Sequence, residues 1–332
     1  MHLSRPDSAI FVAGHRGLVG SAVVRALRAA GYENLVLRSR DEVDLRDQAA
    51  VRALFEETRP AFVVLAAARV GGILANQTYP ANFVADNLAI ATTVTLAAHE
   101  AGVGRRGRLV ALGSSCIYPK HAPQPIREDH LLTGPLEPTN RPYAVAKIAG
   151  LELAEALHRQ HGDDVVSLMP TNLYGPGDLF DLETSHVLPA LVRKFHEAKG
   201  AGPGGADAPV TLWGSGAPRR EFLYVDDLAD AVRFVLETPE AELRAAAPDG
   251  LLNVGVGEDL PIAELAALVR DVVGSRSAVE WDRSKPDGTP RKLLDVGRLR
   301  QLGWAASTGL RDGVEATYRA FLQAEREGTL RA

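Results

Sequence analysis

The sequence contains a single cysteine, Cys116, and no stretch of 18 uncharged apolar residues. One thiol can form no disulfide within the chain, and a cysteine-rich metal site is excluded for the same reason. We expect no membrane-spanning helix, and the first residues lack the apolar segment of a signal peptide. The net charge is −5 without any basic block, so nucleic acid is not an expected partner. These absences predict a cytoplasmic protein that binds neither metal, membrane nor nucleic acid.

The length and the order of apolar segments predict an α/β fold. At 332 residues the chain is long enough for two domains or one large α/β unit. Segments of strand length, such as 62–66 and 108–112, alternate with segments of helical spacing, which indicates βαβ winding into a parallel sheet. We expect a Rossmann-type doubly wound sheet in residues 1–172, completed by about 217–240. A smaller, mixed α/β substrate domain is expected over 173–332.

A glycine-rich turn follows the first predicted strand. It reads Gly14-His-Arg-Gly17-Leu-Val-Gly20 and leads into residues with helical apolar spacing. Glycines let the backbone approach a pyrophosphate closely, and the helix N-terminus adds free N–H groups and the positive end of its dipole. The order strand, turn, helix predicts a dinucleotide-binding site. The alternative is a strand-to-helix turn whose glycines are incidental.

Two arginines favour NADP over NAD as the dinucleotide. Arg40 stands where an acidic residue would hold the ribose 2′-OH of NAD, and Arg16 lies inside the glycine turn. Guanidinium groups suit the 2′-phosphate of NADP because each presents planar, bidentate donors. Asp41 weakens this interpretation, and both arginines could be ordinary surface residues. We predict NADP(H) as the cofactor.

Tyr143 and Lys147 lie four residues apart near the start of a predicted helix, so their side chains share one face. An ammonium group near a phenol stabilises the phenolate and lowers the phenol pKa, which prepares a tyrosine for proton transfer. The same spacing also arises by chance in amphipathic helices. Ser114, Ser115 and Cys116 follow a predicted strand, at the edge where open α/β sheets bind ligands. Ser115 could equally be a turn residue, and a lone cysteine is more often buried and inert.

Several long strings in the sequence resemble one family. The glycine turn and the Y-x-x-x-K spacing resemble the extended short-chain dehydrogenase/reductase superfamily over nearly the whole chain. More specific strings, spread from end to end, resemble the GDP-L-fucose synthase family. They are Gly14-His-Arg-Gly17, Arg69-Val-Gly-Gly-Ile73, Gly113-Ser-Ser-Cys-Ile-Tyr-Pro-Lys120, Leu136-Glu-Pro-Thr-Asn140, Pro170-Thr-Asn-Leu-Tyr-Gly175 and Lys285-Pro-Asp-Gly-Thr-Pro-Arg-Lys-Leu-Leu-Asp295.

The resemblance implies a reaction on a GDP-sugar. The family epimerises GDP-4-keto-6-deoxy-D-mannose at C3 and C5 and then reduces C4 with NADPH to give GDP-L-fucose. The ketone acidifies the C3 and C5 protons, because the carbanion delocalises as an enolate that Ser114 and Tyr143 would stabilise. Cys116 and His186 would act as base and acid, in an order that the sequence does not show. Tyr143 would protonate the C4 alkoxide, while Lys147 would lower the pKa of Tyr143 and hold the nicotinamide ribose.

The resemblance also implies the ligand contacts and the assembly. The cofactor contacts are Gly14, Arg16, Gly17, Leu18, Val19, Gly20, Arg40, Leu112, Gly113, Ser115, Lys147, Pro170, Asn172, Leu173 and His186. The substrate contacts are Ser114, Cys116, Asn172, Lys194, Trp213, Arg220 and Asp287. Arg220 suits a pyrophosphate by its charge, Lys194 lacks the bidentate fork of an arginine, and Trp213 could be a core residue. A homodimer through the predicted helices at 80–102 and 144–160 is expected.

Two other functions are considered. A sugar-nucleotide 4-epimerase or 4,6-dehydratase would recycle tightly held NAD, against which the two arginines and the cysteine argue. A non-catalytic NADP sensor would have no need of Ser114, Tyr143 and Lys147, all of which are present. A fold by itself does not decide among these functions.

Overall fold

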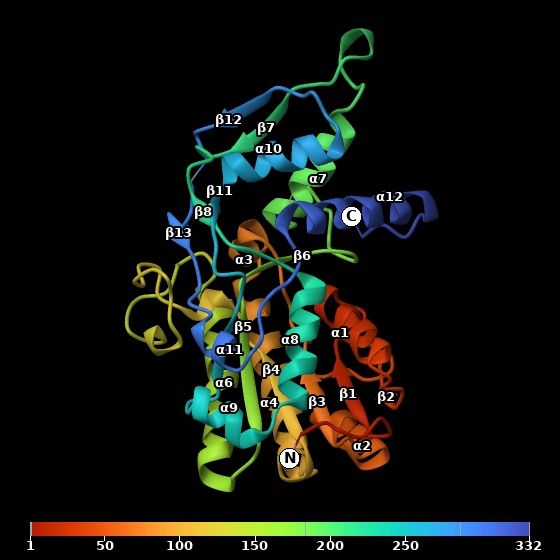
Figure 1. The fold of residues 1–332 in the computed structure, drawn as a ribbon, viewed down its shortest axis with the longest axis vertical. Helices are drawn as coiled ribbons and strands as arrows, with labels where there is room; N and C mark the ends of the chain where they lie inside the picture. Colours follow the sequence, from red (N-terminus) through yellow and green to blue (C-terminus); the bar gives the residue numbers. More distant parts are fainter. Residues whose placement is uncertain (1, 183, 286, 332) are drawn as a thin grey trace.

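The computed structural model describes residues 2–182, 184–285 and 287–331. Its centre is a six-stranded sheet with the order β10-β5-β4-β3-β1-β2, in which every neighbouring pair is parallel (Figure 1). The predicted Rossmann-type doubly wound sheet is therefore confirmed. Its strands are β1 (Ile10–Ala13), β2 (Leu35–Val36), β3 (Phe62–Leu65), β4 (Arg108–Leu112), β5 (Val165–Pro170) and β10 (Leu251–Val254).

Helices cover both faces of this sheet because its central strands are buried on both sides. In β1, Ile10 and Val12 belong to the core on one face, while Phe11 and Ala13 belong to the core on the other. The first face is covered by α1 (Leu18–Ala29) and α8 (Val225–Glu237), which pack against each other. The second face is covered by three helices: α2 (Gln48–Thr58), α4 (Pro80–Glu100) and α6 (Arg141–His161).

A smaller group of elements has a hydrophobic core of its own and lies at one end of the sheet (Figure 1). Its helices are α7 (Val187–Ala198), α10 (Ile262–Val273) and α12 (Leu310–Glu327). Its strands are β7 (Val210–Trp213) with β12 (Val279–Asp282), and β8 (Arg219–Arg220) between β11 (Leu260–Pro261) and β13 (Arg291–Lys292). Strand β6 (Asn172–Tyr174) pairs with β9 (Phe222–Tyr224) where the chain passes between the two groups.

After α7, β7 and β8, which belong to the smaller group, the chain returns to the large sheet. Helix α8 packs on that sheet, and β10 then adds an edge strand beside β5. We keep a division near residue 172 as a proposal. The remaining short elements are α3 (Ile73–Thr78), α5 (Val103–Arg106), η1 (Ser115–Ile117), η2 (Glu128–His130), η3 (Pro203–Gly205), α9 (Glu240–Ala246) and α11 (Gly297–Gln301).

The described part of the chain contains neither a membrane-spanning helix nor a metal-binding cluster. None of its helices combines the length and apolar character needed to cross a membrane. Among the same residues there is no cluster of histidine, cysteine and carboxylate side chains with the geometry of a metal site.

Candidate active site

The glycine-rich turn lies where the order of the parallel strands reverses, between β1 and β3. Gly14 has φ +85°, and a Cβ atom there would lie 2.8 Å from the backbone of Ala67. A Cβ atom on Gly20 would lie 2.1 Å from the Gly14 carbonyl oxygen, so α1 begins directly against the turn. No side chain caps α1 at Gly17, which leaves its N-terminus suited to an anion. The turn thus fits a dinucleotide pyrophosphate.

The loop after β4 and the first turns of α6 bring the predicted reductase residues together. Ser114 Oγ accepts a hydrogen bond of 3.2 Å from the Cys116 backbone N–H, and its hydroxyl also hydrogen-bonds the phenol of Tyr143. Lys147 lies one turn further along α6, with Nζ 5.9 Å from the centroid of the Tyr143 ring. The ammonium group donates a 2.7 Å hydrogen bond to the carbonyl oxygen of Leu112.

Desolvation dominates the protonation of both α6 side chains. It raises the pKa of Tyr143 well above the ordinary value; the Cys116 charge adds to this rise, and the Ser114 hydrogen bond opposes it. Desolvation also lowers the pKa of Lys147 to about 8. The effect that opposes the rise for Tyr143 comes from Ser114, and the expected lowering of the Tyr143 pKa by Lys147 stays a prediction. Its hydrogen bond goes to a backbone carbonyl instead, and the phenol stays a proton donor at neutral pH.

Cys116 lies against a lysine to which the sequence analysis assigned no role. Lys292 Nζ is 3.4 Å from Cys116 Sγ. Desolvation raises the pKa of the half-buried thiol. The Lys292 charge and hydrogen bonds with Ser114 and Lys292 lower this pKa by more than desolvation raises it, so the net pKa is below the ordinary value. A thiolate is the form that takes up protons.

His186 is the N-cap residue of α7, and its side chain is accessible to solvent. Desolvation, and then the charge of Lys292, lowers its pKa. The neutral imidazole can accept or donate a proton near pH 7. Lys292 therefore influences both predicted epimerase residues.

Six of the predicted cofactor contacts outside the glycine turn lie at the ends of strands β4 and β5 or shortly after them. Gly113 N donates a 2.8 Å hydrogen bond to Leu168 O, which ties the end of β4 to β5. Asn172 Nδ2 donates a 2.7 Å hydrogen bond to Glu221 O, which joins β6 to the residue between β8 and β9. Because the carboxyl ends of parallel strands meet at one edge, these contacts line the same side of the sheet. The residues concerned are Leu112, Gly113, Ser115, Pro170, Asn172 and Leu173.

Three of the predicted substrate contacts lie around strand β7. Trp213 is 59% exposed at the end of β7, so it is not a core residue, and Lys285 Nζ lies 5.4 Å from the centroid of one of its rings. Asp287 is close by, because it accepts hydrogen bonds from the N–H and hydroxyl of Ser215, two residues after Trp213. Lys194 also reaches β7. Its Nζ donates a 3.0 Å hydrogen bond to the carbonyl oxygen of residue 211.

Arg220 lies in the small three-stranded sheet that also carries Lys292. The two residues are directly paired across β8 and β13. Arg220 is within electrostatic range of Cys116, whose charge acts on its guanidinium group. The structure thus brings Arg220 near the reacting groups, and its guanidinium group also lies beside Gly288, the residue after Asp287.

The sequence matches the NAD dependent epimerase/dehydratase family over residues 10–255. The chain belongs to that family. It is 54% identical to GDP-L-fucose synthase 1 of Arabidopsis thaliana over 97% of this chain and 95% of that protein. It is 53% identical to GDP-L-fucose synthase of Escherichia coli (strain K12), covering 95% of this chain and 96% of that one. A GDP-L-fucose synthetase from Naegleria fowleri, solved with NADP bound, has a TM-score of 0.85 at 26% identity, with 100% and 98% coverage.

As a member of the epimerase/dehydratase family, the protein is an NAD(P)-dependent enzyme, and the glycine turn is its candidate cofactor site. Arg16 and Arg40 are both exposed. Within the described residues neither guanidinium group is held in a salt bridge. An acidic side chain that the sequence analysis missed, Glu42, faces Arg16 and accepts hydrogen bonds from Ser39 N (2.7 Å) and Ser39 Oγ (2.6 Å).

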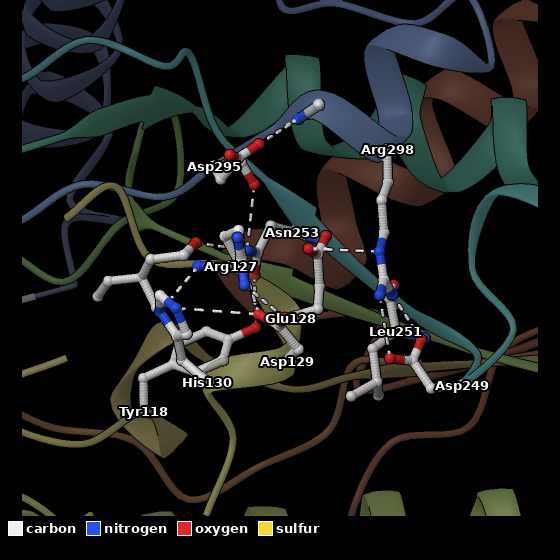
Figure 2. A network of polar contacts seen from close by, with 12 residues as sticks. Tyr118, Arg127, Glu128, Asp129, His130, Asp249, Leu251, Asn253, Asp295 and Arg298 are labelled. Atoms are coloured by element: carbon white, nitrogen blue, oxygen red, sulfur yellow. Dashed lines mark hydrogen bonds and ion pairs between the residues drawn. The ribbon is translucent and has the colours of Figure 1, made fainter. Parts of the chain in front are cut away.

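A buried polar network that sequence reasoning also missed supports the loop after Cys116 (Figure 2). Tyr118 donates a 2.6 Å hydrogen bond to Asn253 Oδ1, and Asn253 N donates a 2.8 Å hydrogen bond to Glu128 Oε1. Arg298 Nε lies 3.5 Å from Glu128 Oε2. Desolvation raises the pKa of Glu128, against the opposing effects of the Asn253 N–H and Arg298. No periodicity or motif in the sequence signals these contacts, which join four separate segments.

Proposed function

We propose that the protein converts GDP-4-keto-6-deoxy-D-mannose to GDP-L-fucose with NADPH as the reductant. The observation that carries the proposal is the position of Cys116 directly beside the Ser114–Tyr143 pair. A simple ketone reductase needs only a serine, tyrosine and lysine at this place. An additional thiol with a lowered pKa supplies the group that removes or returns a proton on the neighbouring carbons.

The epimerisation half of the reaction uses the acidity of carbons next to a ketone. Ser114 and Tyr143 hydrogen-bond the C4 oxygen and stabilise the enolate that forms when C3 or C5 loses its proton. Cys116 and His186 exchange protons with these carbons, one as base and the other as acid. The lowered pKa of Cys116 favours its thiolate, and the lowered pKa of His186 favours its neutral imidazole.

The reduction half of the reaction uses the α6 side chains. NADPH, when bound, supplies the hydride that reaches C4. The protonated phenol of Tyr143 donates its proton to the developing C4 alkoxide, and its raised pKa keeps that proton available. Lys147 holds the nicotinamide ribose from the same helix face.

NADP rather than NAD is proposed as the cofactor. Arg16 and Arg40 are exposed next to the glycine turn, where each can offer bidentate donors to a 2′-phosphate. The Campylobacter jejuni protein MlghC, a GDP-mannoheptose C4 reductase solved with NADP bound, supports this choice. It has a TM-score of 0.86 and 34% identity, and the match covers 96% of this chain and 100% of that chain.

The GDP moiety is proposed to extend from Arg220 towards Trp213. Arg220 carries the charge for the pyrophosphate, and the exposed ring of Trp213 offers an aromatic face beside Lys194 and Asp287. We also propose a homodimer through α4 and α6. These helices pack side by side, and Val145 on α6 is 42% exposed.

The test is NADPH oxidation with GDP-4-keto-6-deoxy-D-mannose in D₂O, followed by NMR of the product. Stoichiometric oxidation with deuterium at C3 and C5 of GDP-fucose supports both halves of the proposal. Oxidation without deuterium incorporation makes the protein a 4-keto reductase and removes Cys116 and His186 from the chemistry. If no NADPH is oxidised, an NAD-recycling epimerase or dehydratase takes the place of this proposal.

A further inference from the structure

Cys116 and Lys292 come from distant parts of the chain. The thiol lies in η1, directly after the central sheet, whereas Lys292 is the last residue of β13 in the small domain. Their 3.4 Å contact therefore spans 176 positions of sequence. The contact joins a cation to the single cysteine of the chain.

The segment that carries Lys292 is fixed by backbone hydrogen bonds on both sides. Strand β13 pairs with β8 in parallel, which places Lys292 opposite Arg220. Immediately after it, Leu293 N donates to Gln124 Oε1 (2.9 Å) and Leu294 N donates to Glu221 Oε2 (3.0 Å). Glu221 is completely buried, so its carboxylate forms a rigid attachment point. The position of Lys292 is thus set by the tertiary structure and not by a flexible loop.

The segment that carries Cys116 is held by the same part of the structure. Tyr118, two residues after the thiol, hydrogen-bonds Asn253 (Figure 2). Asn253 Nδ2 in turn donates a 3.1 Å hydrogen bond to the carbonyl oxygen of Asp295, three residues after Lys292. One buried amide therefore ties the regions on either side of the contact to each other, which keeps the thiol and the ammonium group at hydrogen-bonding distance.

The charges that face the thiol are mostly positive. Lys292 contacts Sγ, and Arg220 lies within electrostatic range. Glu137 acts in the opposite direction, but its Oε1 lies 3.6 Å from Lys120 Nζ, which offsets its charge. Tyr143 faces Cys116 from α6 and is protonated. The balance of charge favours an anionic sulfur.

We propose that Lys292 is a positioning residue that holds Cys116 as a thiolate before substrate binds. For catalysis this inference rests on the proposed function. The thiolate then takes a proton from the carbon next to the ketone, the C–H electron pair forms the enolate double bond while the carbonyl π pair moves to the C4 oxygen, and Lys292 keeps its own proton throughout. Without Lys292, the thiol would first have to lose its proton to another base.

The titration of Cys116 tests this proposal without any GDP-sugar, because the chain has one thiol. The rate of alkylation by iodoacetamide is measured between pH 5 and 10, with mass spectrometry to confirm the modified residue. We expect the rate of the wild-type protein to show its inflection below about pH 8.5, the ordinary pKa of a thiol. In Lys292→Met it rises by roughly 1 to 3 pH units, the range for loss of an adjacent opposite charge.

Two further variants serve as controls. Lys292→Arg retains a cation and is expected to keep the lower inflection, which loss of packing alone would not explain. Lys285→Met removes the same charge from a lysine beside Trp213 and is expected to leave the inflection unchanged. Circular dichroism establishes that each variant is folded. A second measurement, the pH dependence of thiolate absorbance in wild type against Cys116→Ser, needs no lysine variant.

The proposal is overturned if the wild-type thiol titrates at or above its ordinary pKa. It is also overturned if the thiol of Lys292→Met titrates at the same pH as the wild-type thiol. A lysine that only contacted substrate phosphate would give the latter result, together with a raised KM for the GDP-sugar. Because alkylation needs no substrate, failure of the proposed reaction leaves this measurement unaffected. Failure of the thiol titration would likewise leave the product analysis in D₂O unaffected.

Discussion

The ammonium group of Lys147 donates a 2.7 Å hydrogen bond to the carbonyl oxygen of Leu112, the last residue of β4. This bond fixes α6 to the sheet at the start of the loop that carries Ser114 and Cys116. It also directs the cation to the backbone, so desolvation decides the protonation of Tyr143. Lys147 therefore acts first as a structural tie between the tyrosine helix and the cysteine loop, and its low pKa of about 8 follows from the same burial.

Replacement of Tyr143 by phenylalanine removes the proton donor for the C4 alkoxide. We expect kcat for NADPH oxidation to fall by about 10²- to 10⁴-fold, the usual contribution of a general acid. The dissociation constant for NADPH, measured by fluorescence, should change little because Lys147 is retained. A variant that turns over at the wild-type rate would exclude the tyrosine as the donor.

Replacement of Cys116 by serine separates the two halves of the reaction. We expect loss of deuterium incorporation at C3 and C5, whereas NADPH-dependent reduction of C4 continues, because Tyr143 and Lys147 are intact. The product should then keep the configuration of the substrate at C3 and C5, as determined by NMR. Exchange at the wild-type rate would contradict the role of the thiol.

Replacement of Arg40 by alanine tests the proposed 2′-phosphate contact. We expect KM for NADPH to rise by about tenfold, since one charge-assisted hydrogen-bond donor is lost, while KM for NADH changes much less. Steady-state kinetics with both cofactors measure this difference. Arg38→Ala serves as a matched control, because that guanidinium group lies 3.4 Å from Glu57 instead. Equal changes with NADPH and NADH would remove the argument for a phosphate clamp.

The buried ion pair between Arg108 and Asp164 is important for stability. Arg108 Nη2 lies 2.7 Å from Asp164 Oδ2, and both side chains are almost completely inaccessible. Arg108→Met leaves the carboxylate buried without this cation, and we expect it to destabilise the fold by about 3–5 kcal/mol. Arg108→Met combined with Asp164→Leu should recover part of that loss. Urea unfolding of the single and double variants checks both expectations, and an unchanged single variant would contradict them.

The stability of the protein is expected to depend on the protonation of Asp178. Its side chain is buried, and desolvation raises its pKa from 3.8 to about 7, against smaller effects of Leu179 N–H and Arg331. Between pH 4 and 7 the folded state therefore binds more protons at this site than the unfolded state. The contribution of Asp178 to stability falls as the pH rises through that window.

Asp178→Asn removes this titration. We expect the variant to gain stability relative to the wild type between pH 5 and pH 8, by roughly 2–4 kcal/mol for a shift of this size. Thermal or urea unfolding at both pH values measures the difference. Parallel pH profiles of the two proteins would show that Asp178 titrates normally.

Local patterns were enough to predict the cofactor half of the protein. The predicted strand at 108–112 coincides with β4, and the predicted strand at 62–66 differs from β3 by one residue. Both strands are continuous buried runs, and such runs are read directly from apolar composition. The glycine turn was predicted for the same reason, because strand, turn and helix succeed one another within a short piece of chain.

Spacing also predicted that Tyr143 and Lys147 share a helix face, but it could not predict their protonation. The pKa of each group depends on desolvation by atoms from several elements, and on a carbonyl at the end of β4. Trp213 is a similar case. The sequence left a core position open for it, whereas its 59% exposure depends on which surfaces the small domain covers.

The sequence by itself determined the Rossmann-type sheet, the glycine turn and the shared helix face of Tyr143 and Lys147. These features depend on contacts within one helical turn or one strand, where periodicity reflects burial directly. Only the tertiary structure decided that Lys292 faces Cys116 and that Asn253 ties the two segments together. Such contacts join residues 42 to 176 positions apart through strand pairing and buried polar groups, which no local spacing records.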